Sequence, residues 1–288
     1  MYRFKSRAQP REMQIIGIAT GYHLHRILNN LHCSLDYPVR LAQHSRTSIP
    51  PMSQQPIPPQ PTPDTPRIRA LPIVDNGEPL VPASLAPEQV LARPRYHLEG
   101  LPGALPECFV RKGVWTRLLA AAAALPAGHR LVLFDTWRPV GLQRWLFERF
   151  VAECEEHEPG AGLEQAESFV SRPMADSQTN PPYHLTGGAV DLSIADSRGR
   201  LLDMGTDFDT MTAASHTRAF EDAAGADERT IRNNRRLLYH AMIDAGFVNL
   251  PSEWWHYDYG DQLWAWTRDA PHAIYGATRP TFRWGTLP

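Results

Sequence analysis

A proline-dominated stretch over residues 50–66 divides this chain, with Gln, Ser and Thr between the prolines. Such a composition favours extended polyproline conformations and is typical of a linker that buries no core. Residues 1–49 before it are weakly patterned, so we expect residues 1–72 to form a disordered or weakly structured extension. One hypothesis is that the native start is Met52. The remaining residues, 73–288, are then predicted to fold as one domain.

Beyond residue 73 the hydrophobic pattern changes repeatedly between helical and strand periodicity. The strand over 188–194 alternates in a way that predicts one buried face. The order of elements indicates an α+β domain with a small, mainly antiparallel sheet flanked by helices. The expected helices are 114–125, 141–156 and 228–245, and the expected strands are 130–134, 188–194 and 254–259.

Charge and cysteine usage narrow the class of protein. The formal net charge of -2 gives no electrostatic case for binding nucleic acid or an anionic membrane. No apolar run approaches the roughly 20 residues of a membrane helix. Cys33, Cys108 and Cys154 lack the close pairing of a disulfide framework or a thiolate zinc site. We therefore expect a reducing compartment, the cytoplasm, with the periplasm as the alternative.

Two of the motifs carry histidines beside carboxylates. In HLTGGAVD, at residues 184–191, the turn-prone Gly187 and Gly188 can bring His184 and Asp191 to face one point. The alternative is a surface histidine before a strand and an aspartate at its entry. In EWWH, at residues 253–256, the end residues would lie on opposite faces of an ideal strand. Glu253 then suits a general base rather than a ligand. The alternative is a strand whose tryptophans pack the core.

Zinc catalysis commonly uses three protein ligands and keeps a fourth position open. His184, Asp191 and His256 supply that number. A third motif, FDTWRP at residues 134–139, adds Arg138, whose permanent charge can stabilise an oxyanion, and Asp135, which can orient it. A purely structural ion pair between them is the alternative reading of this motif.

Taken in order, FDTWRP, HLTGGAVD, LDMGTDFD at 202–209 and EWWHY at 253–257 resemble D-alanyl-D-alanine dipeptidases, within the zinc D,D-peptidases of family M15. The resemblance implies the Hedgehog/D,D-peptidase-like fold and one Zn²⁺ per subunit. It also implies that two D-alanines are released from the dipeptide, in cell-wall recycling or in glycopeptide resistance. No nucleic-acid or membrane partner is implied, and oligomeric state stays open.

The same resemblance assigns roles to residues. It implies zinc ligands at His184, Asp191 and His256, a catalytic base at Glu253, and stabilisation of the intermediate by Arg138. Asp209 matches the position that receives the substrate ammonium, which would favour dipeptides if this carboxylate is buried or semi-buried. The further substrate-contact candidates are Asp135 and Tyr183. The helix residues Asn233, Arg235 and Arg236 are expected to be structural, with charges facing solvent or neighbouring loops.

One position departs from the family pattern. Pro182 stands where the family often has a serine, so a hydroxyl contact to substrate is lost or replaced. Two other functions remain open. One is a D,D- or L,D-carboxypeptidase acting on peptidoglycan peptides, and the other is a recognition module that binds zinc without catalysis. Retention of both Glu253 and Arg138 argues against the second, since neither is needed to hold the ion.

Overall fold

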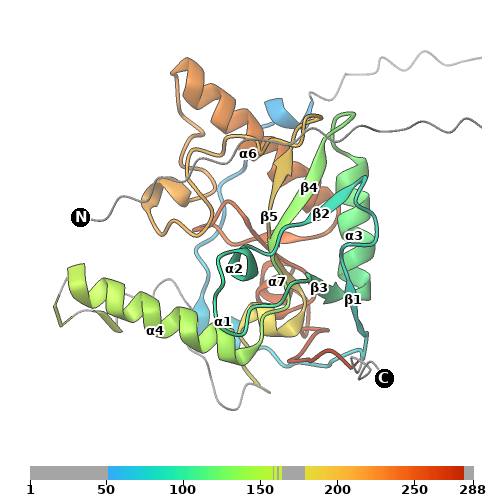
Figure 1. Cartoon of the computed structure of the whole chain (residues 1–288), viewed down its shortest axis with the longest axis vertical. Coiled ribbons are helices and arrows are strands. Elements are labelled where there is room, and N and C mark those ends of the chain that lie inside the picture. The colour runs from blue at the N-terminus through green and yellow to red at the C-terminus, as the bar shows by residue number, and fades with distance from the viewer. Residues whose placement is uncertain (1–50, 158, 161, 164–178, 282–288) are drawn as a thin grey trace, which may run out of the picture. The chain divides into compact units, whose positions relative to one another are not determined.

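The computed structural model describes residues 51–157, 159–160, 162–163 and 179–281 (Figure 1). The helices are the short 3-10 turns η1 (Met52–Gln54), η2 (Tyr183–Thr186) and η3 (Ala213–Ser215), and α1 (Thr65–Ala70), α2 (Arg95–Leu98), α3 (Lys112–Ala123), α4 (Val140–His157), α6 (Ala226–Asp244) and α7 (Gln262–Thr267). The strands are β1 (Leu80–Pro82), β2 (Val90–Ala92), β3 (Phe109–Arg111), β4 (Arg130–Asp135), β5 (Ala189–Ala195), β6 (Val248–Asn249) and β7 (His256–Asp258).

The main sheet has the order β2-β4-β5-β7-β6, and β1 pairs with β3 in a separate antiparallel ribbon. Within the main sheet β2 and β4 are parallel, whereas the other neighbours are antiparallel. Figure 1 shows β2, β4 and β5 side by side, with α3 packed beside β2. The described chain is therefore of the α+β class, as the sequence predicts. Among these residues, no helix combines the length and apolar character needed to span a bilayer.

The central strand β5 is more deeply buried than the sequence predicts. We expected one buried face, but every residue from Ala189 to Ala195 is buried. The strand lies between β4 and β7, and its apolar side chains join the same core as residues of α3 and α6. Both of its faces are therefore covered by protein. The polar side chains of Asp191 and Ser193 are consequently buried within the sheet.

Predicted helices and strands agree with the observed ones to within a few residues for α3, α4, α6, β4 and β5. The exception is the aromatic segment over residues 254–259. Only His256–Asp258 form the strand β7, because Trp254 and Trp255 lie in the preceding turn. Both tryptophans are nevertheless buried in the core, as the sequence suggests. The prediction that this strand begins at residue 254 is thus wrong.

The linker prediction is wrong for the described part of the proline-rich segment. Residues 51–64, which we call the N-terminal strap, pack against the folded domain, and Ile57 is only 1% exposed. After η1 the strap is extended, and an extended proline-rich chain leaves its carbonyl oxygens available to side chains. Arg218 Nε donates to the Ile57 oxygen at 3.1 Å, and His240 Nε2 donates to the Gln55 oxygen at 3.1 Å. Beyond the strap, α1 buries Ile68. The expectation for residues 1–50 lies outside the described residues.

Candidate metal centre

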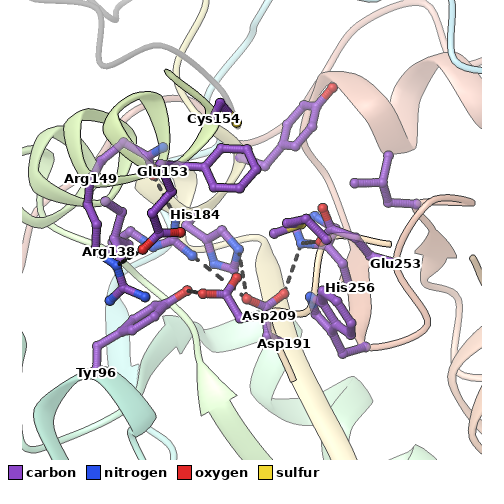
Figure 2. A pocket seen from close by; sticks show the side chains of 17 residues that line it. Tyr96, Arg138, Arg149, Glu153, Cys154, His184, Asp191, Asp209, Glu253 and His256 are labelled. Atoms are coloured by element: carbon purple, nitrogen blue, oxygen red, sulfur yellow. Dashed lines mark hydrogen bonds and ion pairs between the residues drawn. The ribbon is translucent and has the colours of Figure 1, made fainter. Parts of the chain in front are cut away.

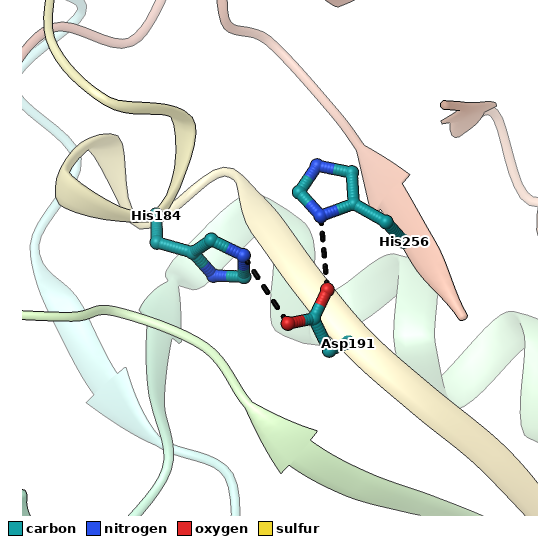
Figure 3. Close-up of side chains that lie close together, drawn as sticks. All are labelled: His184, Asp191 and His256. Atoms are coloured by element: carbon teal, nitrogen blue, oxygen red, sulfur yellow. Dashed lines mark hydrogen bonds and ion pairs between the residues drawn. The ribbon is translucent and has the colours of Figure 1, made fainter. Parts of the chain in front are cut away.

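Three side chains from separate elements meet at one point (Figure 3). One ligand atom from each of His184, Asp191 and His256 lies within 4.8 Å of the others, and all three residues are buried. His184 Nε2 is 3.3 Å from Asp191 Oδ2, and His256 Nδ1 is 2.9 Å from Asp191 Oδ1. The predicted ligand set is therefore brought together, with the carboxylate between two imidazoles.

The register of the strands determines the positions of Asp191 and His256. Asp191 on β5 pairs with Asp135 on β4 and with His256 on β7, so the three residues form a row across the sheet. His184 reaches the row from η2, which is followed by Gly187 with a φ of 71°. That left-handed conformation is strained for residues with a Cβ, so glycine suits the turn. The Gly187-Gly188 turn thus returns the chain towards Asp191, as the motif predicts.

The outer nitrogen of each histidine has an acceptor. His184 Nδ1 donates to the Thr136 carbonyl oxygen at 2.8 Å. His256 Nε2 lies 3.0 Å from Asp258 Oδ2, and Asp258 is fully buried. Such outer contacts fix which imidazole nitrogen faces a metal. Our sequence reasoning missed Asp258, although His256 and Asp258 stand two apart on one strand and therefore on one face.

The electrostatics of the cluster suit a cation. Burial raises the pKa of Asp191, but the neighbouring His184 and hydrogen bonds from both imidazoles outweigh it and hold the pKa below its usual range. Burial lowers the pKa of His256, yet the carboxylates of Asp258 and Asp191 raise it well above its usual value. The side chains thus stabilise positive charge between them. Two imidazoles and a carboxylate also match the donor set of catalytic zinc sites, so these residues fit a bound metal ion.

Glu253 lies beside this cluster, with Oε2 3.7 Å from His256 Nδ1. We expected Glu253 and His256 on opposite faces of a strand. Glu253 instead belongs to the turn before β7, so strand alternation does not apply and both residues line the same cavity. Burial raises the pKa of Glu253 to about 8, with Asp191 and Asp209 acting in the same direction as burial. A cation nearby would lower that pKa and favour the ionised form.

Arg138 is fixed by hydrogen bonds on both sides. Its Nε donates to Asp135 Oδ2 at 2.8 Å, and its Nη1 donates to Gln143 Oε1 at 2.8 Å. Its Nη2 lies 3.7 Å from Asp191 Oδ2. Burial lowers the pKa of Arg138, but Asp135 and Asp191 raise it above its usual value, so the guanidinium remains charged. Asp135 therefore orients Arg138, as expected, while Gln143 is a partner that our sequence analysis missed.

Asp209 faces the same cavity from the loop after β5. Tyr96, which our sequence analysis did not select, donates its hydroxyl to Asp209 Oδ2 at 3.2 Å. The residue as a whole is solvent-exposed. Its carboxylate is nevertheless partly desolvated by the cavity walls, which raises the pKa to about 6 although Arg138 opposes the change.

The loop that carries Asp209 is held from α6. Arg235 is 2% exposed and donates to three carbonyl oxygens of this loop: Met204 at 2.7 Å, His216 at 2.6 Å and Ala214 at 2.8 Å. We expected its charge to face solvent or neighbouring loops, and it faces the loop. Burial lowers its pKa to about 10, which leaves the guanidinium protonated at neutral pH.

The cavity has a volume of about 490 Å³. Figure 2 shows the side chains that line it. Tyr183 lines it, with its ring centroid 6.0 Å from that of His256, whereas Asp135 lies behind Arg138 and is not part of the wall. The residues that line the cavity are Tyr96, Arg138, Gln143, Leu146, Arg149, Phe150, Glu153, Cys154, Tyr183, His184, Asp191, Asp209, Met211, Leu250, Glu253, Trp255 and His256.

Comparison with known proteins identifies the family. Residues 103–275 match the M15 peptidase family described as D-ala-D-ala dipeptidase. The D-alanyl-D-alanine dipeptidase of Synechocystis sp. is 31% identical over 224 residues, which cover 70% of this chain and 90% of that protein. The proteins of the same name from Escherichia coli and Enterococcus faecalis are 30% and 32% identical, over 52% and 49% of this chain and 66% of each relative. This chain therefore belongs to the D-ala-D-ala dipeptidase family of M15 peptidases.

Proposed function

We propose that this chain is a zinc-dependent dipeptidase that hydrolyses D-alanyl-D-alanine to two molecules of D-alanine. The observation that carries the proposal is the buried group of His184, Asp191 and His256 with the Glu253 carboxylate beside it, 3.7 Å from His256 Nδ1. The names of the relatives support the substrate. Because M15 peptidases are metallopeptidases, the family supports a metal at this group.

The proposed ligands are His184 through Nε2, Asp191 through its carboxylate and His256 through Nδ1. These nitrogens point inwards, while the opposite nitrogens face Thr136 and Asp258. When bound, zinc supplies Lewis acidity, which lowers the pKa of water towards neutrality and polarises a carbonyl group. The proposal includes the Hedgehog/D,D-peptidase-like fold, with the metal ligands on its small sheet.

Glu253 and Arg138 have separate roles in the proposed reaction. Glu253 transfers the proton, and Arg138 stabilises the developing negative charge. Glu253 accepts a proton from the attacking water, whose oxygen forms a bond to the peptide carbonyl carbon. The positive guanidinium of Arg138 stabilises the negative charge that develops on the carbonyl oxygen. Glu253 then passes its proton to the amide nitrogen as the C–N bond breaks. One water is consumed, and one carboxylate and one amine are released.

Asp209 supplies the selectivity for a dipeptide in this proposal. Its carboxylate lines the cavity and has only the Tyr96 hydroxyl as a hydrogen-bond donor among the described side chains. A free substrate ammonium would form a charge-assisted hydrogen bond there. A longer peptide has an acylated, uncharged nitrogen at the same place and does not form this charge-assisted hydrogen bond. Asp209 therefore disfavours the substrates of a carboxypeptidase.

The test is release of free D-alanine by the purified, zinc-loaded chain. We expect release from D-alanyl-D-alanine, loss of release with a chelator, and recovery with added zinc. An N-acetylated tripeptide ending in D-alanyl-D-alanine should be cleaved at least about tenfold more slowly, because it lacks the ammonium group. Equal rates on both substrates would favour a carboxypeptidase. Stoichiometric zinc without any hydrolysis would favour a recognition module.

A further inference from the structure

The turn over residues 250–255 has to hold the Glu253 carboxylate and the His256 imidazole in fixed positions relative to each other. It joins β6 to β7, carries Glu253, and delivers His256 at the first position of β7. Turn residues without a regular ladder need other partners for their backbone groups. The turn is docked on residues 215–217, where Trp254 N donates to the Ser215 oxygen at 3.0 Å and Thr217 N donates to the Pro251 oxygen at 3.0 Å.

Asn249, the last residue of β6, bridges this turn with its side chain. Asn249 Nδ2 donates to the Glu253 carbonyl oxygen at 3.0 Å and to the His256 carbonyl oxygen at 2.9 Å. One amide group therefore binds the backbone of both the proposed base and a proposed metal ligand. Asn249 is only 5% exposed, so water does not readily replace either bond.

The orientation of this amide is itself fixed. Asn249 Oδ1 accepts from Thr217 Oγ1 at 2.7 Å and from Gln60 Nε2 at 3.1 Å. An asparagine side chain offers two N–H donors and an oxygen with two lone pairs, and here every one is used. Rotating the amide by half a turn would aim its oxygen at two carbonyl oxygens. A single orientation thus satisfies the group, which makes the support rigid.

Gln60 belongs to the N-terminal strap, and it is separated from Asn249 by 189 positions in the chain. The strap is independently anchored on α6, where His240 Nε2 donates to the Gln55 oxygen at 3.1 Å. The strap thereby contributes a side chain to a network that ends at the two carbonyl groups of the catalytic turn. Packing of Ile57 holds this part of the chain in place.

We propose that Asn249 is a positioning residue for the reaction, held in its orientation by Thr217 and by Gln60 of the N-terminal strap. It acts through Glu253 and His256 and does not touch the substrate, since it is absent from the cavity wall formed by the described residues. This inference rests on the proposed function for its kinetic consequences. The effect of Asn249 on His256, however, extends to metal affinity.

The first test is Asn249→Ala. We expect zinc affinity, measured by competition with a chromogenic chelator, to fall at least about threefold, because the backbone that carries His256 loses a buried hydrogen bond. At saturating zinc we expect kcat to fall at least about tenfold, with the KM for D-alanyl-D-alanine within about threefold, because Asp209 lies on another loop. A general loss of stability would lower the active fraction without changing zinc affinity of the folded protein. Wild-type zinc affinity and wild-type kcat would overturn the proposal.

A matched pair covers the case in which Asn249→Ala does not fold. Thr217→Val has nearly the same shape but lacks the hydroxyl, whereas Thr217→Ser retains it. We expect kcat and zinc affinity to fall at least about threefold in Thr217→Val and to return to within about twofold of wild type in Thr217→Ser. Equal values in the two variants would contradict the inferred network.

The strap has its own control. Gln60→Ala and His240→Ala each remove one hydrogen bond involving the strap, but only Gln60 contacts Asn249. We expect a kcat reduction of at least about twofold in Gln60→Ala and no comparable change in His240→Ala. Equal effects would mean that the strap acts only through overall packing. If the wild-type chain binds zinc but cleaves no D-alanyl-D-alanine, the zinc affinities of these variants still decide the role of Asn249.

Discussion

Asp191 and His256 are direct partners in the register of β5 and β7, and His256 Nδ1 lies 2.9 Å from Asp191 Oδ1. The backbone ladder of a buried sheet thus fixes two of the three proposed ligands before any ion binds. His184 joins them from η2, where the outer contact of its Nδ1 with Thr136 leaves Nε2 facing inwards. Ligands on rigid elements hold their geometry better than ligands on loops.

Glu253→Gln should separate catalysis from metal binding. The amide has nearly the same shape but does not accept the proton from water, so we expect kcat to fall by about 10²–10⁴-fold. Zinc content per chain, measured by mass spectrometry of metals, should equal that of the wild type. A kcat within tenfold of wild type would show that another group moves the proton.

Asp258→Asn should lower the affinity for zinc, although Asp258 is not itself a proposed ligand. The Asp258 carboxylate lies 3.0 Å from His256 Nε2, and an amide there would not fix the same imidazole tautomer. We expect zinc affinity to fall by about 10–100-fold in a chelator competition. Asp196→Asn is the matched control, because Asp196 lies in the turn after β5 and pairs with Arg200 instead. Equal zinc affinities in both variants would show that Asp258 does not contribute to metal binding.

The raised pKa of Asp209 leads us to expect that substrate binding depends on pH. Its pKa is raised to about 6, so the carboxylate becomes protonated as the pH falls through that value and the bond to the ammonium weakens. The KM of the wild type should therefore rise below about pH 6 at saturating zinc, in contrast to a carboxyl with an ordinary pKa near 4.

Asp209→Asn provides the control for this effect. Asp209 has a φ of 66°, and asparagine tolerates that left-handed conformation. We expect the KM of the variant at pH 7 to be about 10–100-fold higher, in keeping with loss of one charge-assisted bond. It should stay nearly constant between about pH 5 and pH 7. The same acid rise of KM in the variant would assign the titration to another group.

Ile57→Ala tests the packing of the N-terminal strap. Ile57 is 1% exposed, so its truncation should lower the free energy of unfolding by about 2–5 kcal/mol in urea denaturation. Val74→Ala is the control, since Val74 is 56% exposed and its truncation should change that free energy by about 0.5 kcal/mol or less. Equal small effects would indicate that the strap does not contribute to the core.

The sequence predicted the parts of this site that local patterns encode. Residue types and short spacings made His184, Asp191, His256, Glu253 and Arg138 candidates, and the order of the motifs, which resembles the dipeptidase family, assigned their roles. The structure brings all five to one cavity. Strand alternation misled us at Glu253, because alternation holds only inside a strand and the strand begins at His256. The same rule, applied from His256 onwards, would have identified Asp258.

Long-range contacts explain the remaining omissions. Composition suggested that the proline-rich segment is a linker, but the burial of Ile57 depends on a surface formed by residues much later in the chain. Asn249 likewise looks like an ordinary polar residue at a strand end. Its role is visible only when Thr217 and Gln60 are placed around it, and no local pattern encodes those contacts.

We propose that His184, Asp191 and His256 together bind one zinc ion. Anomalous diffraction from crystals of the zinc-loaded protein, recorded at the zinc absorption edge, tests it directly. We predict a single strong peak about 2.0–2.2 Å from His184 Nε2, His256 Nδ1 and an Asp191 carboxylate oxygen. A zinc-loaded crystal with no peak among these three side chains, or with its peak on other ligands, would show that they do not form the zinc site.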